Sequence, residues 1–373
     1  VREKENLNEF SSLTGRMRNA SIRAAVFSAL YLPVVLLLGS IGTGIALTAG
    51  GVRLQTGSIS VGVIVAFVGY TVQFFEPVRE VARVLTELQS AQSAAERVGS
   101  LLDTPPEITD SPEVTERFGT VLQPRREEWP PCHGAIRFDR VSFNYRHGRP
   151  VLQDFDLEVA AGESIALVGE TGAGKSTIVN LVGRFYEPVA GRILVDGTDL
   201  RQRSQSWIHS HMGYVLQTPQ LFRGSVRDNI AFARPDATDR EIEEAARMVD
   251  AHGMIMALDG GYLHELGEGG SGISTGQKQL ISFARAVLAD PRIFILDEAT
   301  SSIDTETELR IQRAIRTLME GRTSFIIAHR LSTVRHVDRI LVLEHGRILQ
   351  AGSHDELLAS GGRYSELYRE SLR

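Results

Sequence analysis

One stretch of the sequence combines the residue types that bind phosphate. Residues 168–177 read Val-Gly-Glu-Thr-Gly-Ala-Gly-Lys-Ser-Thr and fit the pattern Gly-x-x-x-x-Gly-Lys-[Ser/Thr]. The apolar run 165–168 before it predicts a buried strand, and the apolar spacing after it predicts a helix. In that setting glycines let the backbone curl so that several N–H groups face an anion, and the positive end of the helix dipole adds to their field. The predicted phosphate-binding residues are Gly169, Glu170, Thr171, Gly172, Ala173, Gly174, Lys175, Ser176 and Thr177.

Two side chains of this loop carry the predicted chemistry. Lys175 offers a compact ammonium to the outer phosphates of a nucleotide, and Ser176 offers a hydroxyl to magnesium. Lysine occurs at only three positions in the chain, whereas arginine supplies most of the positive charge. A lysine here therefore indicates a need for a small ammonium rather than a planar guanidinium. A glycine-rich turn that opens a helix can also be a tight connection without a ligand, so the reading depends on the motifs elsewhere.

A second run of residues supplies carboxylates. The apolar residues 293–296 predict a buried strand that ends in Asp297 and Glu298, about 120 residues after the phosphate loop. Open α/β sheets bind ligands at the carboxyl ends of their strands. We expect Asp297 to hold magnesium through its water shell and Glu298 to orient or deprotonate an attacking water. Acids at a strand end can instead be plain helix caps, but the later strand 324–328, which ends before His329, weakens that alternative.

Composition excludes several classes of protein. The chain has 373 residues, room for two or three domains, and its net charge of −6 shows no basic excess that would point to nucleic acid. Its single cysteine, Cys132, excludes an internal disulfide and a cysteine zinc site, and we interpret it as an incidental linker residue. The histidines are interpreted as ordinary surface residues. Because the chain begins with Val and shows no secretion signal, we expect it to be a fragment or a processed piece.

The first hundred residues predict a membrane hairpin. Residues 24–52 contain no charged residue, and a second uncharged run, 54–75, follows after Arg53 alone. A bilayer core about 30 Å thick needs about 20 helical residues, so each run can span it. The alternative is a buried hairpin of a soluble protein. Because arginines cluster before the first run and after the second, we expect both ends to lie in the cytoplasm.

The remaining chain divides by pattern into three parts. Residues 76–102 have apolar side chains at helical spacing and predict a cytosolic extension of the second membrane helix. Residues 103–133 contain six of the thirteen prolines and predict a linker. Residues 134–373 alternate strand-like and helical patterns, which predicts a parallel sheet covered by helices. The predicted strands are 135–138, 141–145, 155–159, 213–216, 293–296, 324–328 and 340–343, and Thr238 with Glu241 predicts a helix capping box that leads a helix to about residue 251.

With these motifs in place, the chain resembles the ATP-binding cassette (ABC) family, and specifically the exporters that fuse membrane spans to an ATPase domain. Residues 273–277, Ile-Ser-Thr-Gly-Gln, resemble the family signature, which is usually Leu-Ser-Gly-Gly-Gln. The resemblance covers essentially the whole sequence. It implies an α/β P-loop NTPase fold, with a mixed sheet core and a helical subdomain, preceded by transmembrane helices. It also implies a nucleotide-binding domain at 134–373 and a partial transmembrane domain at 1–102.

The resemblance assigns roles to residues in the family's order. Tyr145 would stack on adenine, Gln217 would face the membrane domain and help hold magnesium, and His329 would contact the γ-phosphate. ATP and Mg²⁺ are the implied cofactors. The catalytic residues implied are Lys175, Glu298 and His329, the metal-binding residues are Ser176, Gln217 and Asp297, and the further nucleotide contacts are Ser274, Gly276, Gln277 and Asp304.

The resemblance further implies partners and a location. The signature of one chain would close on ATP held by a second half-transporter, identical or different. Thr275 places a β-branched side chain where the family has glycine, which fits only if its φ is negative. The protein would lie in the plasma (cell inner) membrane as a multi-pass protein with a cytoplasmic ATPase domain, and it would export an amphiphilic or lipid-like substrate. Four further spans are expected before Val1.

Two other functions remain open from the sequence. The chain could act as an ATP-gated channel or regulatory switch that does not pump; the presence of Glu298 favours the exporter. It could also be a soluble cassette that serves an importer or DNA repair, which residues 24–75 disfavour.

Overall fold

The structure, a computed structural model, describes residues 3–146, 148–297, 305–328 and 333–371. The chain divides into two compact units, Val1–Pro106 and Glu107–Arg373. Each unit is described below by itself.

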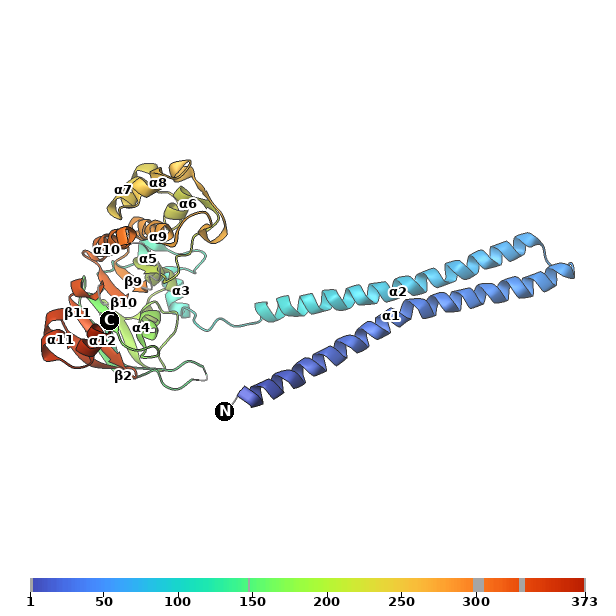
Figure 1. Ribbon diagram of the computed structural model, residues 1–373, viewed down its shortest axis with the longest axis horizontal. Helices are drawn as coiled ribbons and strands as arrows, with labels where there is room; N and C mark the ends of the chain where they lie inside the picture. The colour runs from blue at the N-terminus through green and yellow to red at the C-terminus, as the bar shows by residue number, and fades with distance from the viewer. Residues whose placement is uncertain (1–2, 147, 298–304, 329–332, 372–373) are drawn as a thin grey trace. The chain divides into compact units, whose positions relative to one another are not determined.

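The first unit is a hairpin of two long helices, α1 (Glu3–Gln55) and α2 (Val61–Leu102), which run side by side in opposite directions (Figure 1). The turn between them lies at residues 56–60 rather than at Arg53, where the charge pattern placed it. Gly57 has a φ of 71°, and its N–H donates to the carbonyl of Leu54 at 3.0 Å, which closes the end of α1. One arginine does not break a helix, whereas a glycine in this conformation ends it.

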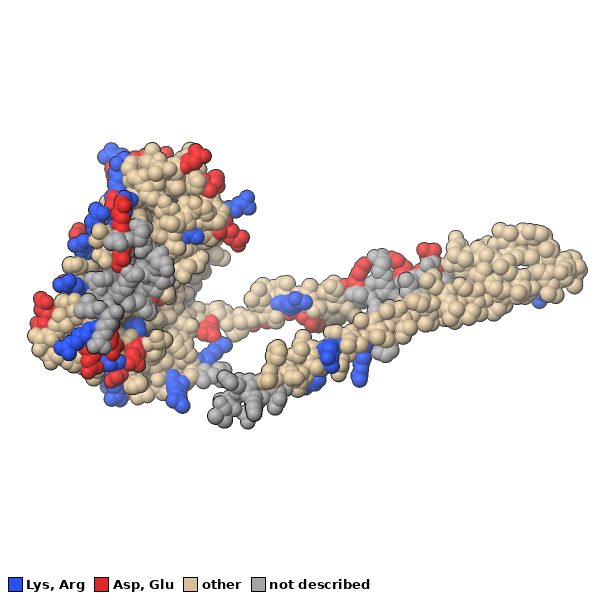
Figure 2. Space-filling view, viewed as in Figure 1, with Lys and Arg blue, Asp and Glu red and all other residues tan. Residues whose placement is uncertain are grey.

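The hairpin exposes most of its apolar side chains. Among the described residues, one helix, Phe10–Gln55, is long and apolar enough to cross a membrane, and only 7% of its most apolar window is buried; Val61–Phe74 is a shorter apolar segment. Phe67 and Leu37 are about three-fifths exposed. Figure 2 shows almost no charged atoms on the visible face of the hairpin around its turn. An apolar surface of this extent is typical of contact with lipid or with other helices.

The second unit is built on a six-stranded mixed sheet in the order β12-β11-β3-β10-β9-β6. Every neighbouring pair is parallel except β11 and β12, which are antiparallel. The strands are β3 (Ser164–Val168), β6 (Met212–Val215), β9 (Ile293–Asp297), β10 (Thr323–Ile327), β11 (Arg339–Glu344) and β12 (Arg347–Gly352). The sheet is mixed, as the resemblance implied: β11, β3, β10, β9 and β6 are parallel as the sequence pattern predicted, and the antiparallel edge strand β12 was not among the predicted strands.

Alternate residues of the central strands face two different cores. Ile165 and Leu167 of β3 join one apolar cluster, whereas Ala166 and Val168 join the other. This follows from the two-residue period of a strand, and it requires cover on both faces of the sheet. In the sequence, strands that are buried on both faces therefore have continuous apolar runs instead of alternating apolar and polar residues.

A second sheet, in the order β2-β1-β4-β5, is antiparallel throughout and lies against the first of these clusters. Its strands are β1 (Ile136–Phe143), β2 (Leu152–Val159), β4 (Ala190–Val195) and β5 (Thr198–Asp199). The sequence predicted two strands where β1 is one. A register shift between Phe138 and Val141, with Arg140 at a φ of 47°, interrupts the alternation there and explains the difference.

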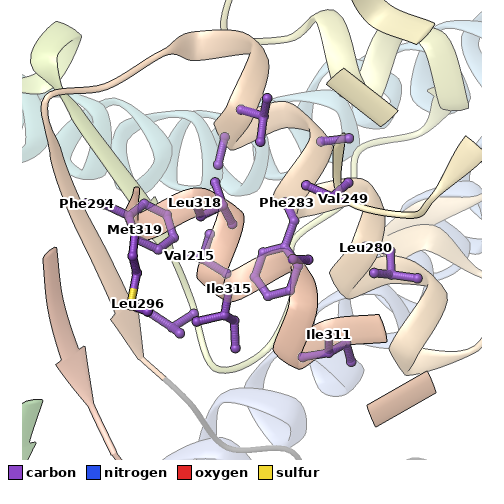
Figure 3. Packing of buried hydrophobic residues seen from close by; sticks show 14 of the residues in the cluster. Val215, Val249, Leu280, Phe283, Phe294, Leu296, Ile311, Ile315, Leu318 and Met319 are labelled. Carbon is purple, nitrogen blue, oxygen red and sulfur yellow. The ribbon is translucent and has the colours of Figure 1, made fainter. Parts of the chain in front are cut away.

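Helices cover the other face and form a separate subdomain (Figure 1). The subdomain contains α6 (Val226–Ala231), α7 (Asp239–Met248), α8 (His252–Met256) and the short pair β7 (Gly224–Ser225) and β8 (Glu265–Leu266). Figure 3 shows how Phe283 of α9 packs among apolar side chains such as Ile315 and Leu318 of α10. The other helices are α3 (Pro112–Phe118), α4 (Lys175–Val182), α5 (Gln205–His211), α9 (Thr275–Ala289), α10 (Thr305–Met319), α11 (His354–Ser360) and α12 (Arg363–Ser371), with 3-10 turns at Arg126–Glu128, Leu200–Gln202, Gly261–Leu263, Glu268–Gly270 and Thr333–His336.

The capping box of α7 is confirmed. The Thr238 N–H donates to Glu241 at 2.8 Å, and the Glu241 N–H donates to the Thr238 hydroxyl at 3.4 Å. The backbone and side-chain bonds from Thr238, helped by Arg234, lower the pKa of Glu241 to about 2. The helix ends at Met248, three residues before the predicted end.

Residues 107–133, most of the linker predicted at 103–133, belong to the second unit. Ser111 caps α3, which buries Val114 and Phe118. Cys132 is a buried core residue and not an incidental one, and burial raises the pKa of its thiol to about 12. Proline predicts that regular helices and strands are interrupted, but it does not indicate whether the segment packs against a domain.

One buried ion pair anchors this segment to the end of α4. Arg184 and Asp110 have side chains that are only 3% and 8% exposed, and Nη1 of the arginine lies 2.8 Å from the carboxylate. Arg184 also donates to the carbonyls of Thr109 and Arg203, and Asp110 accepts from the N–H of Gln205. Removing one member of a buried pair leaves the other charge without compensation.

We expect Arg184→Ala to lower the free energy of unfolding by about 3–5 kcal/mol because Asp110 loses its partner inside the protein. Arg192→Ala is the matched control, since Arg192 pairs with Asp139 while its own side chain is 56% exposed, and exposed pairs contribute about 1 kcal/mol or less. Thermal unfolding of both variants in detergent measures the difference. Equal shifts in the two variants would contradict the structural role of the pair.

Candidate nucleotide-binding site

The motifs predicted from sequence follow the carboxyl ends of neighbouring strands, at one edge of the mixed sheet. The phosphate loop follows β3, Asp297 ends β9, and Gln217 lies just beyond β6. The register aligns these ends, because Ile327 of β10 pairs with Leu167 on one side and with Asp297 on the other. Parallel strands thus bring residues far apart in sequence to one edge.

The backbone of the phosphate loop follows a path that requires glycine. Gly169 has a φ of 152°, and a Cβ there would lie 2.3 Å from the carbonyl oxygen of Leu343 on β11. Gly174 caps α4 with a φ of 104°. Within the part of the chain that the structure describes, the N–H groups of residues 174–177 find no hydrogen-bond partner. These unpaired donors at a helix start fit an anionic ligand such as a nucleotide phosphate.

Lys175 is the cation of this loop. Its residue is 7% exposed, and its Nζ donates to the carbonyls of Gly169 at 2.6 Å and Glu170 at 2.9 Å. Burial lowers the pKa of Lys175, and the carboxylate of Asp297 acts in the opposite direction. The ammonium is therefore held by the loop and lies within the field of the acid at the end of β9.

The other loop residues divide by exposure. Ala173 and Thr177 are buried, whereas Ser176, at the first turn of α4, is exposed together with Glu170 and Thr171. An exposed serine hydroxyl beside Lys175 fits a role as a ligand to a metal ion that is shared with phosphate.

Tyr145, which the resemblance assigns to adenine stacking, lies beside the start of α4. Its hydroxyl and the Thr177 hydroxyl form a hydrogen bond of 3.1 Å, and its ring makes edge contacts with Phe143 and Tyr186. Its residue remains 36% exposed. These contacts hold an aromatic ring next to the start of α4, where an exposed ring face can stack on a base.

The signature residues form the start of α9. Ser274 and Gln277 make a reciprocal capping box: the Ser274 N–H donates to the Gln277 side chain at 2.8 Å, and the Gln277 N–H donates to the Ser274 hydroxyl at 3.3 Å. Gly276 is buried. Thr275 is the first residue of this helix and does not have a positive φ, so it adopts the backbone without the strain that a left-handed position would cause. Among the described residues, no hydrogen bond or ion pair joins 273–277 to the phosphate loop.

Three predicted residues lie outside the described residues, namely Glu298, Asp304 and His329. Gln217 is exposed and Asp297 is half-buried. No three His, Cys, Asp or Glu side chains gather into a metal site in the described ranges. The mixed oxygen set of Ser176, Gln217 and Asp297 remains the candidate, which suits magnesium because this ion keeps waters and phosphate oxygens among its ligands.

One contact at the loop was not predicted. Arg363 of α12 forms an ion pair with Glu170, although the two residues are 193 positions apart. No pattern in the sequence indicates this pairing, since arginines occur throughout the chain.

Comparisons with known proteins agree with this geometry. Residues 152–301 match the ABC transporter family, which includes the phosphate loop and Asp297. The whole chain is 44% identical over 371 residues to the uncharacterized ABC transporter ATP-binding protein YfiC of Bacillus subtilis (strain 168) and covers 59% of it. The chain belongs to the ABC transporter family. The resemblance to exporters with a fused ATPase domain, the P-loop fold and the ATPase class are thereby confirmed.

A further relative and a solved structure are similar to this ABC protein. It is 44% identical over 360 residues to the fatty acid ABC transporter ATP-binding/permease protein of Mycobacterium bovis, covering 96% of this chain and 55% of that protein. The structure of a bacterial Atm1-family ABC exporter with ATP bound matches all of this chain and 63% of its own, with a TM-score of 0.68 and 32% identity. The chain thus spans 55–63% of these relatives' lengths.

The glycine requirement in the ABC phosphate loop can be tested directly. We expect Gly169→Ala to destabilise the fold by several kcal/mol, because its Cβ would meet the Leu343 carbonyl at 2.3 Å. Gly172→Ala should cost only about 1–2 kcal/mol from its positive φ, since nothing lies within 4 Å of the added Cβ. Thermal unfolding without nucleotide compares the two, and a larger loss in Gly172→Ala would contradict the geometry.

Proposed function

We propose that the chain is the ATP-hydrolysing part of an exporter half, which couples ATP binding and hydrolysis to the export of an amphiphilic substrate. The observation that carries this proposal is the position of Lys175, held by its own loop in the field of Asp297, in a chain that also contains an apolar helix hairpin. A candidate phosphate site and an apolar hairpin in one chain support a protein that couples ATP hydrolysis to transport across a bilayer.

We assign the phosphate loop and Lys175 to the triphosphate, and Tyr145 to the adenine ring. Ser176, Gln217 and Asp297 would hold Mg²⁺, which when bound neutralises charge on the phosphates. Glu298 would orient or deprotonate the attacking water, and His329 would contact the terminal phosphate. In the sequence Glu298 follows β9 directly and His329 is the second residue after β10; these positions support both roles, because the two strands end at the same edge as the phosphate loop.

The signature is proposed to act on a second half-transporter. The start of α9 carries exposed residues Ser274 and Thr275, and the capping box with Gln277 fixes their backbone. A rigid, exposed helix start suits an anion of another molecule. Since no hydrogen bond or ion pair among the described residues joins it to the phosphate loop of its own chain, we propose a dimer in which each signature meets the partner's nucleotide.

The substrate class follows from the apolar hairpin and from one relative. The hairpin has no charged residue in 24–52 that would select an ionic cargo. A relative 44% identical is named as a fatty acid transporter. We propose a lipid-like or amphiphilic substrate and a multi-pass protein of the plasma membrane, with residues 134–373 in the cytoplasm and the helical part of 1–102 in or beside the bilayer.

We expect Lys175→Ala to weaken ATP binding at least tenfold and to abolish turnover, because the buried ammonium has no substitute in the loop. Lys175→Arg should not restore turnover, since a planar guanidinium cannot take the place of a compact ammonium. Glu298→Gln is the matched comparison and should retain ATP binding while it loses turnover. Nucleotide titration and phosphate release measure both. Unchanged ATP affinity in Lys175→Ala would refute the proposed site, and normal turnover in Glu298→Gln would refute the role of that glutamate.

Mixed dimers test whether two chains share each site. A chain with Lys175→Ala retains an intact signature, and a chain with Ser274→Arg retains an intact phosphate loop. Each variant alone should be inactive, because every site lacks one half. Mixing the two restores one complete site in each mixed dimer, so ATPase activity should return to at most half of the wild-type rate per dimer. No recovery in mixtures shown to contain mixed dimers would contradict the shared site.

A further inference from the structure

The phosphate loop contains an acidic residue that works against its ligand. Glu170 follows Gly169 directly, and its side chain is 73% exposed. Asp297, at the end of β9, acts to raise the pKa of Lys175, so its negative charge is also felt at this loop. Glu344, the last residue of β11, lines a small cavity of about 90 Å³ together with residues 169–173. Anionic side chains thus gather at a loop whose backbone suits an anion, and like charges at short range repel.

Arg363 compensates the acid that is nearest in sequence to the phosphate donors. Its Nη2 pairs with the Glu170 carboxylate, while its Nη1 lies 3.1 Å from Glu366 on the same helix. Arg363 also lines the cavity beside the loop, as does Leu367. One arginine therefore joins the C-terminal helix α12 to the phosphate loop.

Arg363 is the first residue of α12, and the start of this helix is held by contacts in the core. The neighbouring Tyr364 is fully buried, and its hydroxyl bonds with Nδ1 of His354 at 2.7 Å. The N–H of Tyr364 donates to the side chain of Gln350 on β12 at 3.0 Å. Because these contacts hold the start of α12, the guanidinium of Arg363 needs little additional ordering to reach Glu170.

We propose that Arg363 is a positioning residue for nucleotide binding: it neutralises the Glu170 carboxylate and thereby makes the ATP affinity of the loop depend on helix α12. The proposal rests on the proposed nucleotide role of this loop. It predicts that the acid is harmful to ATP binding only when the arginine is absent. A merely structural role of Arg363 would not depend on the charge at position 170.

A double-mutant cycle in the full chain tests this dependence. The variants are Arg363→Ala, Glu170→Gln and the double variant, and Arg369→Ala near the end of the same helix controls for the loss of one exposed arginine. We expect Arg363→Ala to raise the Kd for magnesium-ATP about fivefold to tenfold. The double variant should return to within about twofold of wild type, and Arg369→Ala should not change the Kd. The defect of Arg363→Ala should shrink as salt rises, since both side chains are reached by solvent.

Each other outcome has a definite meaning. An unchanged Kd in Arg363→Ala, or an equal defect in the double variant, overturns the proposal, because the charge of Glu170 then has no part in it. If Arg363→Ala does not fold, as judged by unfolding without nucleotide, Arg363→Gln removes the charge and keeps most of the side chain, and the same cycle is run with it. Lys175→Ala, measured in parallel, distinguishes a wrong nucleotide site from a wrong inference about Arg363. If Lys175→Ala also binds ATP normally, the proposed site is wrong. If Lys175→Ala loses ATP binding and Arg363→Ala does not, only the inference about Arg363 is wrong.

Discussion

The close approach of the phosphate loop to strand β11 constrains the rest of the site. A side chain at Gly169 would lie 2.3 Å from the Leu343 carbonyl oxygen, so the loop can leave β3 along this path only with a glycine. That path brings the carbonyls of Gly169 and Glu170 to the ammonium of Lys175 and leaves the first N–H groups of α4 without partners in the described chain. A core normally tolerates few unpaired donors. Their presence at a helix start explains why this edge of the protein suits an anion.

The sheet supplies the rigid frame for this arrangement. Strands β3, β10 and β9 are adjacent and parallel, and each is covered on both faces by apolar clusters. Buried parallel strands cannot slip in register without exposing apolar side chains. The loop and Asp297 therefore keep a fixed relation to each other, and Arg363 of α12 pairs with Glu170 of the same loop.

Within the second unit, its first segment is held to the rest by a buried ion pair. The pair Arg184 and Asp110 is buried and lies just beyond α4, the helix that the phosphate loop opens. At the start of α9, Ser274 and Thr275 of the signature are instead exposed, and a capping box holds the first turn. The second unit thus contains the buried pair of residues 110 and 184, the edge of the sheet that we propose for nucleotide binding, and the helix start that we propose for a partner.

The sequence by itself determined which local structures form and which chemistry they can carry. Glycine spacing, Lys175 and the apolar run before Asp297 predicted the loop, the strand and the acid, because backbone freedom, charge and periodicity are properties of single residues and their neighbours. The same periodicity placed β6, β9, β10 and β11 to within one or two residues, and the uncharged runs predicted the apolar hairpin.

Only the tertiary structure decided how distant residues meet. The edge strand β12, the burial of Cys132 in a proline-rich segment, and the pairs of Arg184 with Asp110 and Arg363 with Glu170 have no local signature. The sequence does not indicate whether an arginine pairs with a nearby acid, with a distant acid or with water. Which of these it finds depends on the packing of the strands and helices between them, and that packing is set by the sum of many weak contacts rather than by any single motif.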